Sequence, residues 1–301
     1  MSLAAFTLVG ALMASGQAAP PVAQQTAAVA PAPAVTPIRA SKIILVGDST
    51  TAVIGGWGPS FCTDHVTSFV ACVNLARGGR SSGSYIAEGS WDLALAEMAT
   101  PGFAQTYVLI QFGHNDQPGK PGRSTDLATE FPANLKRYVE ETRARGAIPV
   151  LLTPLTRRQF VDGRLDNDLE PWAEATRRVA RETGAPLVDL NASSVAAVQA
   201  LGPMMSARFA QAAPSPEVAA ALLTGTTIAS STGVPATPAP AAAAPPAASQ
   251  AQNNALVEPL GQARMSFDYT HVGREGADFF AALVTRDLIL AVPALRRQLV
   301  P

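Results

Sequence analysis

Ser49 stands just after residues 42–46, a short apolar run rich in β-branched side chains that has the length of a buried strand. Gly47 and Asp48 end this run in a polar turn. A serine at such a turn exposes its hydroxyl beside free backbone amides, so Ser49 is a candidate nucleophile for acyl transfer. The motif is not the Gly-x-Ser-x-Gly elbow of the α/β-hydrolases. Taken alone, an ordinary serine or Asx turn is the alternative.

A serine nucleophile needs a histidine base, and the chain has three histidines. His65 precedes the second expected strand, at the wrong end of the sheet. His114 follows the third expected strand, with only Asp116 near it in sequence. His271 has Asp268 three residues earlier, which brings both side chains to one turn at the start of a helix. The pattern predicts His271 as the base and Asp268 as its orienting partner, with a simple helix cap as the alternative for Asp268.

Two further loops carry groups suited to holding an oxyanion. The glycine-rich loop 74–83 contains Gly78 and Gly79, where a backbone amide is open to close approach. This loop lacks the residues of a P-loop and the spacing of a dinucleotide fingerprint. Asn115 offers a carboxamide just after the apolar run 107–112. Each signal is weak by itself, because Gly and Asn are common turn residues.

Alternating strand-like and helix-like segments must position these groups. Strands are expected over 42–46, 69–73, 107–112, 147–152 and 186–190, and helices over about 131–142, 172–182, 190–201 and 272–288. This alternation predicts parallel βαβ units, whose ligand cleft lies at the carboxyl ends of the strands. Ser49, Gly79 and Asn115 each follow a strand, so the topology gathers them along one edge of the sheet.

Two segments have little charge and few large apolar side chains. Residues 1–40 begin with the apolar run 3–13 and continue into a Pro-rich spacer, which predicts an export signal and a secreted or periplasmic protein. Residues 211–262 contain eight prolines and two charged residues, which predicts a flexible insertion. The remainder has the size of one domain, 41–301, interrupted by that insertion.

Composition also argues against several function classes. The net charge is −1 and no Lys/Arg-rich run is present, so no nucleic-acid partner is expected. The N-terminal apolar run is too short to span a membrane. No Cys-x-x-Cys pair or histidine cluster predicts a metal site, no cofactor is expected, and we expect a monomer. Cys62 and Cys72 could form a disulfide or remain two buried thiols, and the sequence does not decide between them.

Together these motifs resemble those of the SGNH (GDSL-type) hydrolases, most closely the rhamnogalacturonan/pectin acetylesterase branch. The resemblance rests on residues 47–51 (GDSTT), 74–82 (NLARGGRSS), 111–116 (QFGHND) and 268–271 (DYTH). It implies an α/β fold, a flavodoxin-like three-layer α/β/α sandwich around a five-stranded parallel sheet. It also implies Ser49 as nucleophile, His271 as base and Asp268 as its orienter. The amides of Ser49 and Gly79 and the Asn115 side chain would form the oxyanion hole. The long insertion before Asp268 departs from the family pattern.

The resemblance implies a serine esterase that removes O-acetyl groups from pectin-type polysaccharide through an acetyl-serine intermediate. One alternative is another SGNH esterase, acting on xylan, small esters, lipids or thioesters. The other is a non-catalytic carbohydrate-binding protein, which the complete set of motif residues disfavours.

Arginines near the expected cleft suggest an acidic substrate. Arg80, Arg157 and Arg158 follow the second and fourth expected strands, and guanidinium groups pair bidentately with carboxylates such as those of galacturonate. Solvated loop charge or a structural ion pair is the alternative for each arginine. Trp91 is a further candidate for sugar contact.

Overall fold

The computed structural model describes residues 38–229 and 265–301, and Arg39–Pro301 form one compact unit. The expected export signal, apart from residues 38–40, lies outside the described residues. So do residues 230–262 of the expected insertion.

Five parallel strands form the central sheet, in the spatial order β2-β1-β3-β4-β7. They are β1 (Ser41–Gly47), β2 (Val70–Asn74), β3 (Thr106–Gln111), β4 (Ile148–Leu152) and β7 (Leu187–Val188). This is the flavodoxin-like order, in which β2 lies on one side of β1 and the later strands are added on the other side, starting with β3. The predicted fold class is confirmed.

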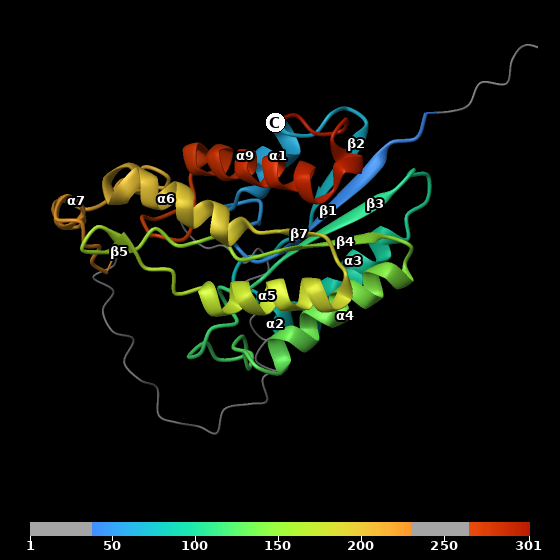
Figure 1. Cartoon of the computed structure of the whole chain (residues 1–301), viewed down its shortest axis with the longest axis horizontal. Coiled ribbons are helices and arrows are strands. Elements are labelled where there is room, and N and C mark those ends of the chain that lie inside the picture. The colour runs from blue at the N-terminus through green and yellow to red at the C-terminus, as the bar shows by residue number, and fades with distance from the viewer. Residues whose placement is uncertain (1–37, 230–264) are drawn as a thin grey trace, which may run out of the picture. The chain divides into compact units, whose positions relative to one another are not determined.

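Helices cover both faces of the sheet (Figure 1). They are α1 (Gly58–Asp64), α2 (Ser82–Ala87), α3 (Ser90–Met98), α4 (Glu130–Ala144), α5 (Glu170–Thr183), α6 (Leu190–Ala207), α7 (Pro216–Leu223) and α9 (Arg274–Ala291), with a final 3₁₀ turn η1 (Pro293–Leu295). Ile43 and Leu45 of β1 pack with α1, α6 and α9. Ile44 and Val46 point the other way and pack with α2 to α5. Successive side chains of one buried strand thus belong to two hydrophobic cores, one on each face of the sheet.

Several elements differ from the sequence expectation. The short helices α1, α2 and α3 and the hairpin of β5 (Phe160–Val161) and β6 (Arg164–Leu165) were not predicted. The last strand, β7, is only two residues long, because Asp189 already caps α6 by accepting a hydrogen bond from the Ala192 amide. Helix α6 runs past the expected end at 201, with a kink at Gly202, whose φ is 71°.

The expected insertion starts too early at residue 211. Helix α7 lies inside it, with Ser215 as N-cap. Val218 and Leu222 of α7 are buried in a small cluster with Ala207 and Tyr269. The alanine-rich composition hid a helix that buries only two large side chains, so the prediction of flexibility is wrong for this part of the segment.

Cys62 of α1 and Cys72 of β2 form a disulfide, which settles the alternatives left open by the sequence. Both residues pack against the core on the α9 side of the sheet. Within the described residues, no helix is both long and apolar enough to cross a membrane.

Candidate active site

Ser49 lies in a tight turn at the carboxyl end of β1. The amides of Thr51 and Ala52 donate to the Asp48 carbonyl at 3.2 and 3.0 Å. The Asp48 side chain accepts from the amide and hydroxyl of Thr50 at 2.9 and 2.7 Å. Ser49 itself is 5% exposed. These hydrogen bonds define the turn, and its serine reaches the surface over a small area.

The two loops that carry the expected oxyanion donors are tied to this turn and to each other. The Arg77 amide donates to the Gly47 carbonyl at 3.0 Å, which holds the glycine-rich loop beside the end of β1. The Asn115 side-chain amide donates to the Arg80 carbonyl at 3.0 Å. Gly79, with φ of 75°, has a left-handed backbone that favours glycine. Topology and hydrogen bonds together place Ser49, Gly79 and Asn115 on neighbouring loops at one edge of the sheet.

Asp268 and His271 form a hydrogen-bonded pair. Nδ1 of His271 lies 2.9 Å from Oδ2 of Asp268. The other carboxylate oxygen, Oδ1, accepts from the amides of Thr270 and His271 at 2.7 and 2.6 Å. Burial alone would raise the pKa of Asp268, but His271 and these hydrogen bonds outweigh it and lower that pKa. The carboxylate therefore stays ionised and holds a proton on Nδ1, which leaves Nε2 as the basic nitrogen.

His271 packs against the loop that follows Ser49. The Val272 amide donates to the Gly55 carbonyl at 2.8 Å. A Cβ placed on Gly55 would lie 3.3 Å from Cδ2 of His271, so the absence of a side chain there makes room for the imidazole. These contacts bring the histidine pair to the same edge of the sheet as the serine turn.

Arg158, in the loop after β4, holds the segment that carries this pair. Its backbone amide donates to the Tyr269 carbonyl at 2.9 Å. Its guanidinium donates to the carbonyls of Asp268 and His271, both at 2.8 Å, and to that of Thr270 at 3.2 Å. One residue thus binds four consecutive carbonyls. Burial lowers the pKa of Arg158 to about 10, so the group remains charged at neutral pH.

A second, buried acid–histidine pair lies beneath Ser49. Nδ1 of His114 is 3.3 Å from Oδ2 of Asp48, and both side chains are in the interior. Burial lowers the pKa of His114, an effect that Asp48 opposes. Burial alone would raise the pKa of Asp48, but His114 and Thr50 outweigh it and lower that pKa. We therefore describe the pair as a carboxylate beside a neutral imidazole. The sequence offered no obvious partner for His114, because the Asp48 contact joins the ends of two strands.

Asp116 joins the glycine-rich loop to the loop after β3. Its Oδ1 accepts from the Ser82 hydroxyl at 2.6 Å, the Ser82 amide at 3.1 Å and the Thr125 hydroxyl at 2.8 Å. Burial raises the pKa of Asp116 to about 7, although the hydrogen bonds from Ser82 and Thr125 oppose that shift.

Three of the four expected substrate contacts lie in the interior. Trp91 is fully buried and donates its indole N–H to Glu141 at 2.5 Å. Arg80 is 2% exposed and pairs with the buried Glu88 at 2.9 Å, and Arg158 is 1% exposed. These three side chains are buried and bonded to internal partners, so the substrate-binding role expected for them is wrong. Residue type alone does not reveal such burial.

Arg157 is the partly exposed member of the expected set. Its guanidinium is paired with Asp168, and it also donates to Oε1 of Gln117 at 2.8 Å. Its Nε lies 3.3 Å from the Thr270 hydroxyl, one residue before His271.

The candidate site consists of side chains and backbone amides suited to acyl transfer. Among residues 38–229 and 265–301, no three His, Cys, Asp or Glu side chains converge as a metal site would require. A serine turn, a carboxylate-oriented histidine and two donor loops on a flavodoxin-like sheet define a serine hydrolase.

Comparison with known proteins identifies the family. Residues 45–209 match the GDSL-like lipase/acylhydrolase family, and the chain belongs to it. This match includes Ser49, Gly79 and Asn115 but ends before Asp268 and His271.

Two relatives agree with this assignment, and a solved structure agrees with the fold. The chain is 34% identical over 164 residues to the probable rhamnogalacturonan acetylesterase YesY of Bacillus subtilis, covering 52% of this chain and 73% of the relative. It is 37% identical over 176 residues to the rhamnogalacturonan acetylesterase RhgT of the same organism, covering 56% and 72%. The crystal structure of B. subtilis YxiM is similar in fold, with a TM-score of 0.54 and 20% identity. That alignment covers 84% of this chain and 57% of the solved chain.

Proposed function

We propose that this protein removes O-acetyl groups from rhamnogalacturonan-type pectin, with Ser49 as nucleophile, His271 as base and Asp268 as its orienting partner. The Asp268–His271 hydrogen bond of 2.9 Å, beside the loop that follows Ser49, is the observation that carries the proposal. The names of the relatives YesY and RhgT support the substrate class.

The reaction follows from the groups present. The Ser49 hydroxyl attacks the acetyl carbonyl carbon while Nε2 of His271 takes its proton. Amides of Ser49 and Gly79 and the Asn115 carboxamide stabilise the oxyanion, and one such donor contributes roughly 3–4 kcal/mol. The C–O bond to the sugar then breaks, and the sugar oxygen receives the proton from His271. Water, deprotonated by the same histidine, releases acetate and regenerates the Ser49 hydroxyl.

We extend the proposal to an exported protein. The Cys62–Cys72 disulfide supports it, because disulfides persist in oxidising compartments. The apolar run at 3–13 supports it as well.

The direct test is acetate release from acetylated rhamnogalacturonan by wild type and Ser49→Ala. We expect Ser49→Ala to lose several orders of magnitude in kcat without loss of thermal stability, because this turn hydroxyl makes little contribution to packing. Ser68→Ala is the matched control, since Ser68 is exposed just before β2, at the opposite edge of the sheet. A folded Ser49→Ala protein that keeps most of the activity would rule the mechanism out.

A second candidate, hydrolysis of longer acyl esters, is favoured by one observation. The side chains of Val53 and Ile54, 63% and 46% exposed, lie in the loop between Ser49 and Gly55, the glycine against which His271 packs. A p-nitrophenyl ester series from acetyl to octanoyl distinguishes the two functions. An acetylesterase has its highest kcat/KM on the acetyl ester, whereas the kcat/KM of a lipase-like enzyme rises with acyl chain length.

A further inference from the structure

The side chain of Gln211 lies beside the proposed base. A Cβ placed on Gly55 would be 3.2 Å from Nε2 of Gln211 and 3.3 Å from Cδ2 of His271, so both side chains border the space that this glycine leaves open. Cδ2 is bonded to Nε2 of the imidazole, the nitrogen that takes the serine proton. A carboxamide therefore lies next to the edge of His271 at which the reaction takes place.

The backbone of Gln211 is packed against the residues that follow His271. The Gly273 amide donates to the Phe209 carbonyl at 2.8 Å. A Cβ placed on Gly273 would be 2.8 Å from the Ala210 carbonyl oxygen and 3.3 Å from Cα of Gln211, so a larger residue would clash there. Phe209 itself is buried in the core. The position of Gln211 is thus tied to the segment that carries the base.

The carboxamide of Gln211 has no hydrogen-bond partner among the residues that the structure describes. Its Oε1 atom is buried. A buried amide oxygen without a partner costs free energy, which a ligand that carries hydroxyl groups can recover. The last torsion of a glutamine side chain is soft, so the group can offer either Nε2 or Oε1 to such a hydroxyl.

Gln211 also lines a pocket of about 320 Å³ beside the loop that follows Ser49. This volume is at the lower end of the range for small-molecule sites, roughly 300–1,000 Å³. Several apolar side chains line it, among them Val53, Ile54, Pro59 and Val272.

The other polar side chains of this pocket have internal partners. Ser60 donates to Asp278 at 2.6 Å, and Arg274 donates to Asp278 at 2.9 Å. Within the described residues, Gln211 is therefore the polar lining side chain without a partner. Apolar walls with one unpaired carboxamide suit a sugar ring, which presents both C–H groups and hydroxyls. An acyl chain offers no hydrogen bond to Gln211.

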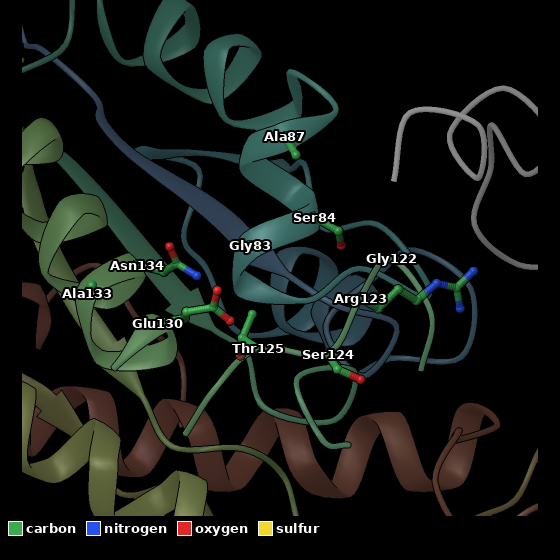
Figure 2. Close-up of a pocket in the computed structure, with 10 residues that line it drawn as sticks. All are labelled: Gly83, Ser84, Ala87, Gly122, Arg123, Ser124, Thr125, Glu130, Ala133 and Asn134. Carbon is green, nitrogen blue, oxygen red and sulfur yellow. The ribbon is translucent and has the colours of Figure 1, made fainter. Parts of the chain in front are cut away.

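A second pocket of similar volume, between α2 and α4, differs in this respect (Figure 2). The Glu130 carboxylate there accepts from the Asp126 amide at 2.7 Å, and the Asn134 side-chain amide donates to the Ser82 hydroxyl at 3.1 Å. The polar side chains that α4 contributes are thus bonded within the protein. We therefore place the sugar in the pocket beside Gln211.

We propose that Gln211 binds substrate: its carboxamide forms a hydrogen bond with a hydroxyl of the sugar that carries the acetyl ester, and the ring lies in the adjoining pocket. The proposal rests on the proposed function and names the group that distinguishes a sugar ester from a simple ester. When Ser49 attacks the ester, the leaving oxygen receives its proton from Nε2 of His271. The sugar that bears this oxygen therefore lies next to Gln211.

The test compares acetylated rhamnogalacturonan oligosaccharides with p-nitrophenyl acetate, whose leaving group has no neighbouring hydroxyl. Gln211→Met keeps the length of the side chain and removes the carboxamide. On the oligosaccharides, kcat/KM should fall about three- to tenfold, mainly through KM, because the bond to the hydroxyl is the same in the ground and transition states. On p-nitrophenyl acetate it should change by less than about twofold, which also shows that the variant is folded.

Gln105→Met is the matched control and should behave as wild type on both substrates. Gln105 is partly exposed just before β3, at the opposite edge of the sheet. Equal losses by Gln211→Met on the two substrates, or no loss on the oligosaccharides, would overturn the role of Gln211 alone. Wild-type protein that hydrolyses p-nitrophenyl acetate but not the oligosaccharides would overturn the proposed substrate, and this proposal with it.

Discussion

Replacing Arg158 by methionine should displace the Asp268–His271 pair without touching either residue. Methionine keeps much of the buried volume and the backbone amide that donates to Tyr269. It removes the guanidinium that binds the carbonyls of Asp268, Thr270 and His271. The segment then loses three of its four hydrogen bonds to residue 158.

The size of the effect follows from these contacts. A hydrogen bond from a charged donor contributes roughly 1.5–3 kcal/mol, so three contribute about 5–9 kcal/mol. Removing a buried cation also removes its desolvation penalty of several kcal/mol, which offsets part of this loss. The free energy of unfolding should therefore fall by on the order of 3 kcal/mol. A displacement of about 1 Å at the histidine is enough to lower kcat roughly a hundredfold.

Urea unfolding and p-nitrophenyl acetate kinetics measure the two effects separately. We expect Arg158→Met to lower kcat far more than it raises KM, because the ester-binding loops are unchanged. Arg158→Gly supplemented with guanidinium ion should recover part of the lost kcat, since the ion can occupy the vacated site. Arg145→Met, at the opposite edge of the sheet, is the control. Wild-type kcat and stability in Arg158→Met would refute the assigned positioning role.

Three further predictions concern stability and pH. Cys62→Ser with Cys72→Ser opens a short loop and should lower the free energy of unfolding by about 2–3 kcal/mol, measured by urea titration. The folded pKa of Asp116, near 7, exceeds its ordinary 3.8, so the unfolded chain releases a proton that the folded one keeps; stability should fall as pH rises between these values. Asp116→Asn should flatten that slope, and an unchanged slope would exclude Asp116 as its source. The lowered pKa of Asp268 makes its stabilisation present above 3.8 and lost as pH falls through the folded value. Asp268→Asn should remove this acid-side loss and lower kcat about 10²–10⁴-fold, because His271 is no longer held in the productive tautomer.

The centre of the sheet was predictable because every residue of β1 and β3 is buried. The runs at 42–46 and 107–112 are nearly all apolar, and both became strands within a residue of the expected bounds. Helices α1 to α3 were missed because six to nine residues are too few for a clear 3.6-residue period.

The places of the candidate catalytic groups were predictable for a topological reason. Ser49, Gly79 and Asn115 each follow a parallel strand, and such strand ends meet at one edge of the sheet. The environments of the charged side chains were not predictable in this way. Arg158 and Arg80 occur in the expected loops, but their partners are carbonyls and a carboxylate that only the folded chain brings within reach.

Asp268 and His271 show how a sheet-edge site accommodates a residue pair from far along the chain. The pair is held by Arg158 after β4, by the Gly55 carbonyl after β1, and by the Gly273 amide, which donates to the Phe209 carbonyl at 2.8 Å. All three ties come from residues that the structure describes. These ties hold the Asp268–His271 pair at the end of the sheet that also carries the Ser49 turn, so loops that follow β1 and β4 set the geometry of the proposed base.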